Sequence, residues 1–152
     1  MSKMSSLSAK KMPIIVLGST DDINRMALED RRVDLLLCPE ETRKKDFMKW
    51  RNSGLNHVLC KLANKNNIKI GISFSRLNRM GSEEKSLKIG KIMQNIRLCR
   101  KYKVKLILAS FAESESDLLS SYEMKSIGFV LGMTPQQVNE SLENAGEIFE
   151  VK

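Results

Sequence analysis

Short runs of mostly apolar residues recur along this chain, and a segment of helical length follows each of them. The runs are PIIVLG (13–18), VDLLLCP (33–39), IKIGISF (68–74) and VKLILAS (104–110). In VDLLLCP the apolar residues are consecutive, which is typical of a strand covered on both faces. Strands that alternate with helices need crossover connections and therefore form a parallel sheet. The pattern predicts an α/β fold, either a doubly wound sheet or part of a (β/α) barrel.

The length of the chain limits how much of a barrel it can build. A complete (β/α) barrel usually needs ~200 residues or more, whereas this chain has 152 residues. We expect a flexible leader over residues 1–12, followed by a single barrel-like domain over residues 13–152. The leader lacks the apolar centre of a secretory signal, and the sequence contains no run of the ~20 apolar residues that a membrane span requires. These features predict a cytoplasmic protein with no membrane partner.

Capping residues and apolar periodicity predict the helices. Ser19 or Thr20 is placed to cap a helix that runs to about Asp30, and Thr134 to cap a helix that begins at Pro135. Further helices are expected from Leu55 to the NKNN tract (64–67), from Ser82 to about Tyr102, and after Ser116.

The remaining segments are expected to connect or close these units. Residues 40–54 are polar and basic, and we expect a short helix or loop in which Phe47 and Trp50 act as anchors. Residues 76–82 (RLNRMGS) are expected to form a loop, and residues 147–151 (EIFEV) a last strand. The cysteines at positions 38, 60 and 99 stand among apolar residues without CxxC spacing, which predicts buried, reduced thiols.

The charge is divided unevenly along the chain. Residues 31–105 hold 20 basic and 6 acidic side chains, whereas residues 106–152 hold 2 basic and 8 acidic ones. Each Lys or Arg that neutralises a phosphate releases condensed counterions, so a strongly basic segment favours a polyanionic partner such as nucleic acid. The alternative is a merely solvated, lysine-rich surface.

The sequence contains few groups that could carry catalysis. GxxxxGK[ST], GxGxxG and GxSxG are absent, and His57 is the single histidine, so clusters of His and Asp around metal ions are not available. Helical spacing turns His57 away from an apolar stripe, to the side that also holds residues 60, 61 and 64. A histidine on an exposed basic face contacts a phosphate or a partner more often than it acts as a general base without an orienting carboxylate.

Two further groups of basic residues are candidates for binding. On the long helix the expected inner face carries Ile89, Ile92, Met93, Ile96 and Cys99, and the opposite face carries Lys91, Gln94, Arg97 and Lys101. Arg76 and Arg79 follow the carboxyl end of a strand, where α/β folds present ligand sites and where Arg can bind phosphate bidentately. Solubilising charge is the alternative reading. Because only 5% of residues are aromatic, we expect recognition of the backbone and shape of structured RNA rather than base stacking.

Four segments of the chain resemble a known family, archaeal ribonuclease P protein component 3, the counterpart of the thirty-kilodalton subunit in eukaryotes. The resemblance runs from about Ile14 to Met133, and the second segment is the most specific. The segments are VDLLLCP, SGLNHVLCKLANKNNIKIGISF, NIRLCRKYKVKLILASFAESESDL and LGMTPQQV.

The resemblance implies a partial or shortened TIM-like barrel, related to the metal phosphoesterases but without their metal site. It implies a subunit that binds ribonuclease P RNA and precursor tRNA, pairs with a small ferredoxin-like subunit and supports removal of the 5′ leader. The RNA would supply catalysis with magnesium, and the protein would hold no cofactor. The candidate RNA- or partner-binding residues are His57, Lys61, Lys65, Arg76, Arg79, Lys91, Arg97, Arg100 and Lys101.

The chain departs from the family pattern in two places. Relatives begin with further strand and helix units, so the strand at 13–18 is expected to be an unpaired edge that a partner or a second copy covers. Leu119 stands where the family carries an Arg, so one RNA contact is expected to be lost or moved. Two other functions stay open at this point: a stand-alone small (β/α) phosphoester hydrolase, and a structural adaptor of another ribonucleoprotein.

Overall fold

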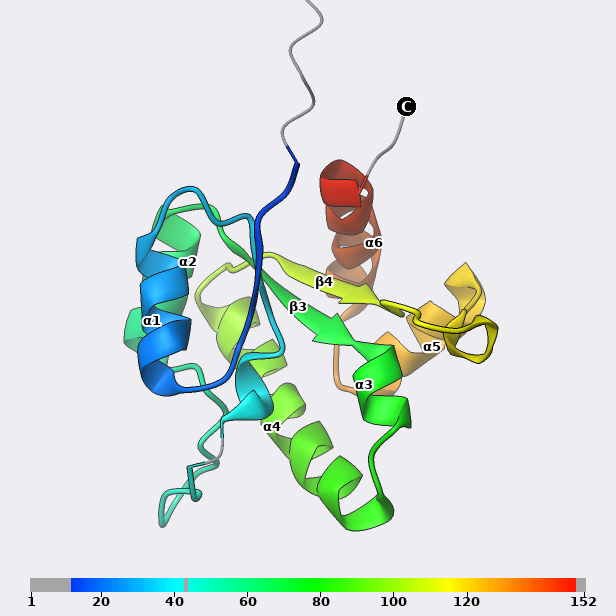
Figure 1. Ribbon diagram of the computed structural model, residues 1–152, viewed down its shortest axis with the longest axis horizontal. Helices are drawn as coiled ribbons and strands as arrows, with labels where there is room; N and C mark the ends of the chain where they lie inside the picture. Colours follow the sequence, from blue (N-terminus) through cyan, green and yellow to red (C-terminus); the bar gives the residue numbers. More distant parts are fainter. Residues whose placement is uncertain (1–11, 43, 150–152) are drawn as a thin grey trace, which may run out of the picture.

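The computed structural model describes residues 12–42 and 44–149, which form a parallel four-stranded sheet with helices between the strands (Figure 1). The strands are β1 (Ile15–Leu17), β2 (Leu35–Leu37), β3 (Lys69–Ser73) and β4 (Leu106–Ala109), paired in sequence order. Each strand lies inside one of the four predicted apolar runs. The predicted parallel (β/α) architecture is confirmed, and within the described residues the sheet is open.

The helices follow the predicted alternation with two corrections. They are α1 (Asp21–Glu29), α2 (His57–Lys65), α3 (Phe74–Asn78), α4 (Ser82–Lys101), α5 (Ser121–Val130) and α6 (Pro135–Phe149), with 3-10 turns η2 (Pro39–Glu41) and η3 (Glu115–Asp117).

The first correction concerns residues 76–82, which were expected to form a loop. Most of this stretch belongs to α3 or to the start of α4, because the Ser73 hydroxyl accepts a hydrogen bond from the Arg76 amide and caps a short helix. The expected last strand at 147–151 is also wrong where it can be seen: α6 continues to Phe149, and the following residues lie outside the described part. Segment 40–54, expected to form a short helix or loop, contains the end of η2 and is a loop over its other described residues.

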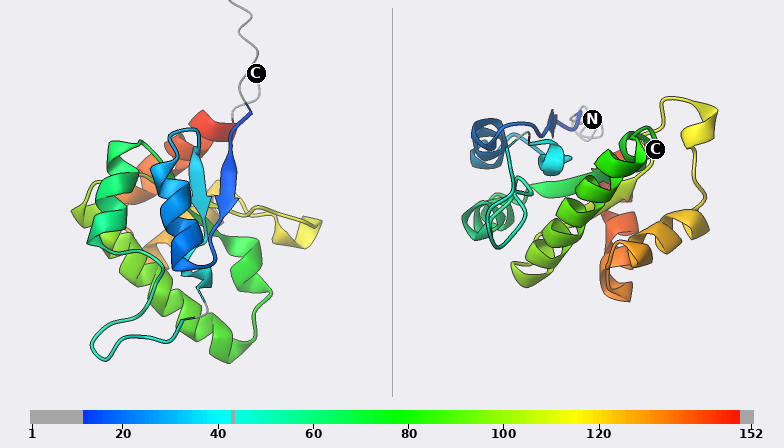
Figure 2. Two further views of the ribbon diagram at one scale, coloured as in Figure 1. Left: turned by 60° about the vertical axis from the view of Figure 1, so that its left-hand side comes forward. Right: turned by 90° about the horizontal axis from the view of Figure 1, so that it is seen from below.

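The helices are arranged in order around the sheet. Helices α1 and α2 pack on each other beside β1 and β2, whereas α6 packs against β4 (Figures 1 and 2). Between these two ends, α4 crosses beneath the sheet with contacts to α2, α3 and η2. The centre of the core is fully buried, with Leu36 and Ile70 from the strands against Ile92 and Ile96 from α4.

The apolar face of α2 differs in phase from the prediction. Leu55 is buried but precedes the helix, which begins only after the Asn56 side chain accepts a hydrogen bond from the Leu59 amide. Val58, expected inside, is half exposed, and Cys60, expected on the outer side, is fully buried. All three cysteines are buried and free, as predicted.

The two edges of the sheet are treated differently. At β4 the Asn144 side chain of α6 donates a hydrogen bond of 3.1 Å to the Leu106 carbonyl, so a helix covers that edge. At β1 the Ile14 carbonyl and the Gly18 amide bond to β2, which turns the amides of Ile15 and Leu17 outward. The side chains of Ile15 and Leu17 are 38% and 45% exposed. Within the described residues β1 is therefore an open edge, as predicted.

A buried turn follows β2 and connects it to segment 44–56. Asn24 of α1 is fully buried and donates hydrogen bonds to the carbonyls of Pro39 and Gly54. Gly54 has φ +81°, and a Cβ there would lie 1.9 Å from the Pro39 oxygen. Only glycine fits this close approach, which fixes where the segment begins its return toward α2.

Glu40, in the same turn, is a buried carboxyl. Its side chain is 3% exposed, and among the described residues its Oε2 atom has no hydrogen-bond partner. Burial raises the pKa of Glu40 to about 7, because the charged form loses its hydration.

We predict that Glu40→Gln removes a pH-dependent loss of stability. A carboxyl with a raised pKa favours the folded state at low pH, and this contribution disappears as pH rises from about 4.5 through about 7. The variant should match the wild type in urea unfolding at pH 4 and exceed it at pH 8, by at most about 3 kcal/mol in the free energy of unfolding. Glu143→Gln on the exposed side of α6 is the control. An equal difference between Glu40→Gln and the wild type at both pH values would contradict this assignment.

Candidate nucleic-acid interface

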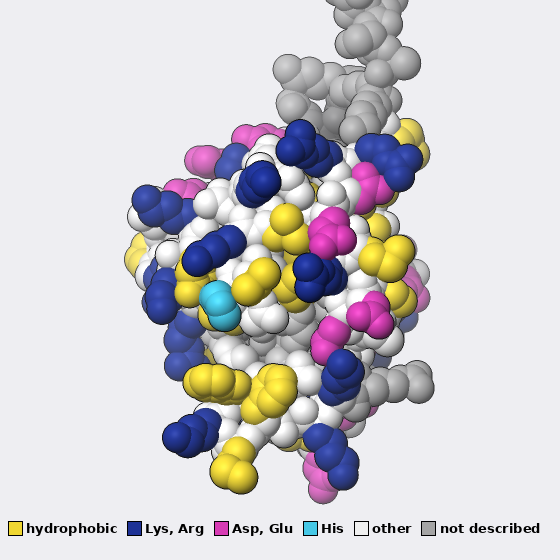
Figure 3. Space-filling model, turned by 90° about the vertical axis from the view of Figure 1, so that its left-hand side faces the viewer, with side chains coloured by type: hydrophobic (Ala, Val, Ile, Leu, Met, Phe, Trp, Pro, Cys, Tyr) yellow, Lys and Arg dark blue, Asp and Glu magenta, His cyan; other side chains and the backbone are white. Residues whose placement is uncertain are grey.

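The outer face of α2 carries three of the predicted binding residues. His57, Lys61 and Lys65 stand four residues apart in succession, so their side chains follow one side of the helix, and all three are exposed. Figure 3 shows the single histidine on a face where Lys and Arg side chains gather to one side of it, with exposed hydrophobic side chains below. The prediction that His57 faces outward is confirmed.

Lys61 of α2 and Lys101 of α4 meet at one aromatic ring. Their ammonium nitrogens lie 5.9 Å and 5.5 Å from the centre of the Tyr102 ring. Each cation is attracted to the ring face, but two like charges beside one ring repel each other. A phosphate between them would neutralise both, so the end of α4 and the face of α2 form one basic surface.

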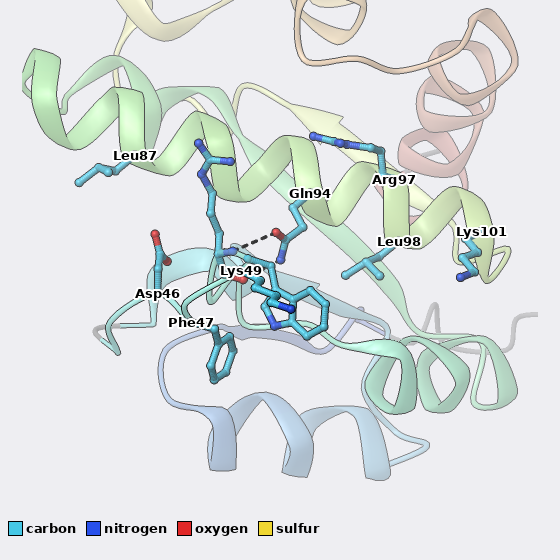
Figure 4. Close-up of a pocket in the computed structure, with 10 residues that line it drawn as sticks. Asp46, Phe47, Lys49, Leu87, Gln94, Arg97, Leu98 and Lys101 are labelled. Atoms are coloured by element: carbon cyan, nitrogen blue, oxygen red, sulfur yellow. Dashed lines mark hydrogen bonds between the residues drawn. The ribbon is translucent and has the colours of Figure 1, made fainter.

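A surface groove lies between α4 and segment 46–51 and opens beside this basic surface. It encloses about 620 Å³ and is lined by Asp46, Phe47, Lys49, Trp50, Arg51, Leu87, Gln94, Arg97, Leu98 and Lys101 (Figure 4). Two of the predicted binding residues, Arg97 and Lys101, therefore share a site with residues from a distant part of the sequence.

Amide side chains of α4 hold segment 51–53 in place. Gln94 accepts a hydrogen bond of 3.2 Å from the Arg51 amide and donates one of 2.7 Å to the Arg51 carbonyl (Figure 4). Asn95 donates a hydrogen bond of 3.0 Å to the Ser53 carbonyl. One backbone residue is thus bound through both its polar groups, which fixes the wall of the groove relative to α4.

Lys91 is a correction to the predicted outer face of α4. Only 9% of it is exposed, and its ammonium group lies 3.9 Å from an Asp46 carboxylate oxygen. Asp46 also accepts a hydrogen bond from the Asn52 amide. Lys91 is covered because segment 46–53 packs over this part of α4, so the lysine supports the segment rather than facing a ligand.

The side chain of Arg51 lies across α4. A Cβ built on Gly90 would come within 2.5 Å of the Arg51 Nε atom, so the guanidinium rests where a side chain at position 90 would otherwise be. Arg97 is seven residues from Gly90 and therefore on the same side of the helix. Figure 4 shows the Arg97 side chain extended along α4, toward the Leu87 end.

Two other predicted residues, Arg76 and Arg79, form ion pairs within the fold. Arg79 pairs with Glu113 at 2.6 Å and with Asp117 at 2.8 Å, and Arg76 lies 3.8 Å from Glu41. Burial alone would raise the pKa of the Asp117 carboxyl, but hydrogen bonds from the Glu113 amide and from Arg79 lower it below its usual range. The charges of Arg76 and Arg79 are thus balanced by carboxylates.

Arg100 links α4 to the turn before α6. Its guanidinium donates hydrogen bonds to the Gly132 carbonyl at 2.7 Å and to the Gln137 side chain at 3.0 Å. Both acceptors are neutral, so the charge of Arg100 remains exposed while its position is fixed.

Sequence reasoning missed four residues of this surface: Lys49, Trp50, Arg51 and Tyr102. Phe47 and Trp50 were expected to anchor their segment, but their side chains are 58% and 67% exposed. The anchors are instead the amide groups of α4. The only available signal was the KWR tripeptide at 49–51, in which an aromatic residue stands between two cations.

No group of three or more His, Cys, Asp or Glu side chains in residues 12–42 and 44–149 is placed to hold a metal ion. No helix in the same residues is long and apolar enough to cross a membrane.

Comparison with known proteins places the chain in a family. The model of the family described as RNase P subunit p30 matches residues 1–152. The chain belongs to the RNase P subunit p30 family. The resemblance to archaeal ribonuclease P protein component 3 is confirmed by a relative of that name from Methanosarcina acetivorans, which is 35% identical over 134 residues, 88% of this chain and 53% of the relative.

Other relatives of the same name show similar coverage. Ribonuclease P protein component 3 of Thermococcus gammatolerans is 32% identical over a match that covers 87% of this chain and 58% of the relative. A chain in the cryo-EM structure of archaeal ribonuclease P with mature tRNA matches with a TM-score of 0.79 and 27% identity, over 96% of this chain and 60% of that chain. The chain thus spans about half the length of the p30-family relatives that it matches.

We predict that Gln94→Leu frees the wall of the groove while α4 stays folded. Without the two hydrogen bonds to Arg51, segment 46–53 should move faster, and the fluorescence anisotropy of Trp50, the single tryptophan, should fall. Gln136→Leu is the control, because Gln136 bonds only along α6, to Glu140. Unchanged anisotropy in Gln94→Leu would show that other contacts hold the segment.

Proposed function

We propose that this chain is an RNA-binding protein subunit of ribonuclease P that supports removal of the 5′ leader from precursor tRNA. The observation that carries the proposal is the surface formed by α2, Tyr102 and the end of α4. There Lys61, Arg97 and Lys101 are exposed, and within the described part of the chain none of them pairs with a carboxylate. Such cations favour phosphate, because binding releases counterions from the RNA.

The comparisons support the same proposal. The chain belongs to the RNase P subunit p30 family, and this supports ribonuclease P as the assembly. The matched solved chain comes from archaeal ribonuclease P with mature tRNA. The likeness covers nearly the whole of this chain. The RNA and tRNA partners are therefore proposed from family and fold together with the surface charge.

Catalysis in the proposed assembly belongs to the RNA, which would use magnesium, and the protein would act without a cofactor of its own. The protein's part is to neutralise phosphates and hold the RNA in place. We propose that this occurs in the cytoplasm.

Protein partners are proposed for two roles. A small ferredoxin-like subunit would bind beside the RNA, as the family resemblance implies. A partner subunit or a second copy would cover the open edge of β1, since outward amides and exposed apolar side chains at Ile15 and Leu17 invite another strand. If the protein sediments as a stable monomer both alone and when mixed with the other subunits, the proposal that the β1 edge is covered is rejected.

We predict that Arg97→Ala combined with Lys101→Ala weakens RNA binding without unfolding the protein. The wild type should bind ribonuclease P RNA with an affinity that falls steeply with salt, with a log–log slope of several units. Removing two phosphate contacts should reduce that slope by roughly two. Fluorescence anisotropy with labelled RNA between low and moderate salt measures both quantities.

The matched control removes two exposed lysines that lie outside α2 and α4, Lys105→Ala with Lys125→Ala. This control keeps the change of net charge but leaves the surface of α2 and α4 intact. If both double variants lose the same slope, binding depends on net charge alone. A wild-type affinity that does not respond to salt would reject the proposed function.

A further inference from the structure

The groove between α4 and segment 46–51 combines an aromatic ring with unbalanced positive charge. Four cations line it, Lys49, Arg51, Arg97 and Lys101, against the single carboxylate of Asp46. That carboxylate already accepts a hydrogen bond from the Asn52 amide and lies 3.9 Å from Lys91. Within residues 12–42 and 44–149 none of the four cations pairs with a carboxylate, so the groove is complementary to an anion.

Trp50 is exposed although its segment is held firmly. The side chain is 67% exposed, while the next residue, Arg51, is bound through both backbone polar groups to Gln94. A large apolar ring left in water is costly, and the backbone of the next residue is anchored to α4. An exposed aromatic plane beside cations is the arrangement on which proteins stack bases of single-stranded nucleic acid.

Arg51 and Arg97 supply the matching positions for a phosphate. Arg51 lies over Gly90, and Arg97 extends along the same side of α4 toward it (Figure 4). Guanidinium groups bind phosphate oxygens bidentately, and two of them along one side of α4 favour a backbone phosphate there. The groove volume of about 620 Å³ is within the range of sites that enclose small ligands, ~300–1,000 Å³.

We propose that this groove binds one unpaired nucleotide of the RNA, with its base stacked on Trp50 and its phosphate held by Arg51 and Arg97. The inference rests on the proposed RNA-binding function and adds a position where the protein reads an unpaired base. A base inside a duplex has both faces covered by its neighbours, so only a bulged or single-stranded nucleotide can reach the Trp50 ring. This proposal differs from the sequence-based expectation, in which base stacking is not the mode of recognition.

The test compares two RNA hairpins that differ by one bulged nucleotide. The full-length protein should bind the bulged hairpin about tenfold more tightly than the fully paired one, since stacking one base contributes roughly that factor. Binding of the bulged hairpin should quench the Trp50 fluorescence, and the paired hairpin should leave it nearly unchanged. Trp50→Leu should lower the affinity for the bulged hairpin to that for the paired hairpin, and Trp50→Phe should restore most of the difference.

Phe129→Leu, which removes an exposed aromatic side chain from α5, is the matched control and should keep the preference for the bulge. Equal affinity of the wild type for both hairpins, or an equal loss for both in Trp50→Leu, would overturn the stacking site and leave the RNA-binding function standing. No binding of either hairpin would overturn both. Displacement of the bulged hairpin by polyglutamate at the same concentration of charges would show a site for acidic protein instead.

A second variant, Gly90→Ala, tests whether Arg51 belongs to the site, because it should raise stability and weaken binding. Gly90→Ala places a methyl group 2.5 Å from Arg51 Nε, so the guanidinium must move, and this is easy at the end of a flexible side chain. Alanine is also the better helix former. The melting temperature should rise while the affinity for the bulged hairpin falls several-fold. A higher melting temperature with unchanged affinity would remove Arg51 from the site.

Discussion

The paired hydrogen bonds between Gln94 of α4 and the backbone of Arg51 determine much of the molecule's functional surface. They attach a polar, basic segment to the longest helix, 43 residues away in sequence. Because the segment lies over α4, Lys91 is covered and becomes a support for Asp46, whereas Trp50 and Arg51 are displayed on the outside. The same attachment leaves Arg97 and Lys101 uncovered at the end of the helix, where α2 adds its own cations.

The basic residues of the middle segments therefore divide into two groups. Arg76, Arg79 and Lys88 are paired with the carboxylates of Glu41, Glu113 and Asp117 and connect elements at the carboxyl end of the sheet. His57, Lys61, Lys65, Arg97 and Lys101 are exposed on α2 and α4. Charge that is already balanced contributes little to binding RNA, since pairing with a phosphate would first have to break an existing ion pair. The RNA surface is thus expected at the second group.

The alternation of strands and helices could be predicted from the sequence because it depends on local periodicity. Capping worked for the same reason, as at Thr20 and Thr134, whose hydroxyls accept the expected amide hydrogen bonds. The burial of side chains was predicted wrongly where it depends on packing between segments that are distant in sequence. Leu55 continues the apolar stripe of α2 in sequence but lies before the helix, which shifted the expected face and put Cys60 outside. Lys91 was expected to be exposed but is buried, and Trp50 was expected to anchor its segment but is exposed. Neither could be predicted, because no periodicity marks the segment that packs over α4.

We infer that the face made by α2 and the end of α4 binds ribonuclease P RNA. The most direct measurement is to isolate the protein from its own cells at low salt, cross-link it with ultraviolet light, and map both the RNA and the cross-linked peptides. Ribonuclease P RNA should be recovered, with cross-links in residues 49–65 and 97–102, and it should be lost at high salt. Isolation without RNA, or cross-links confined to α5 and α6, would rule out binding at this face.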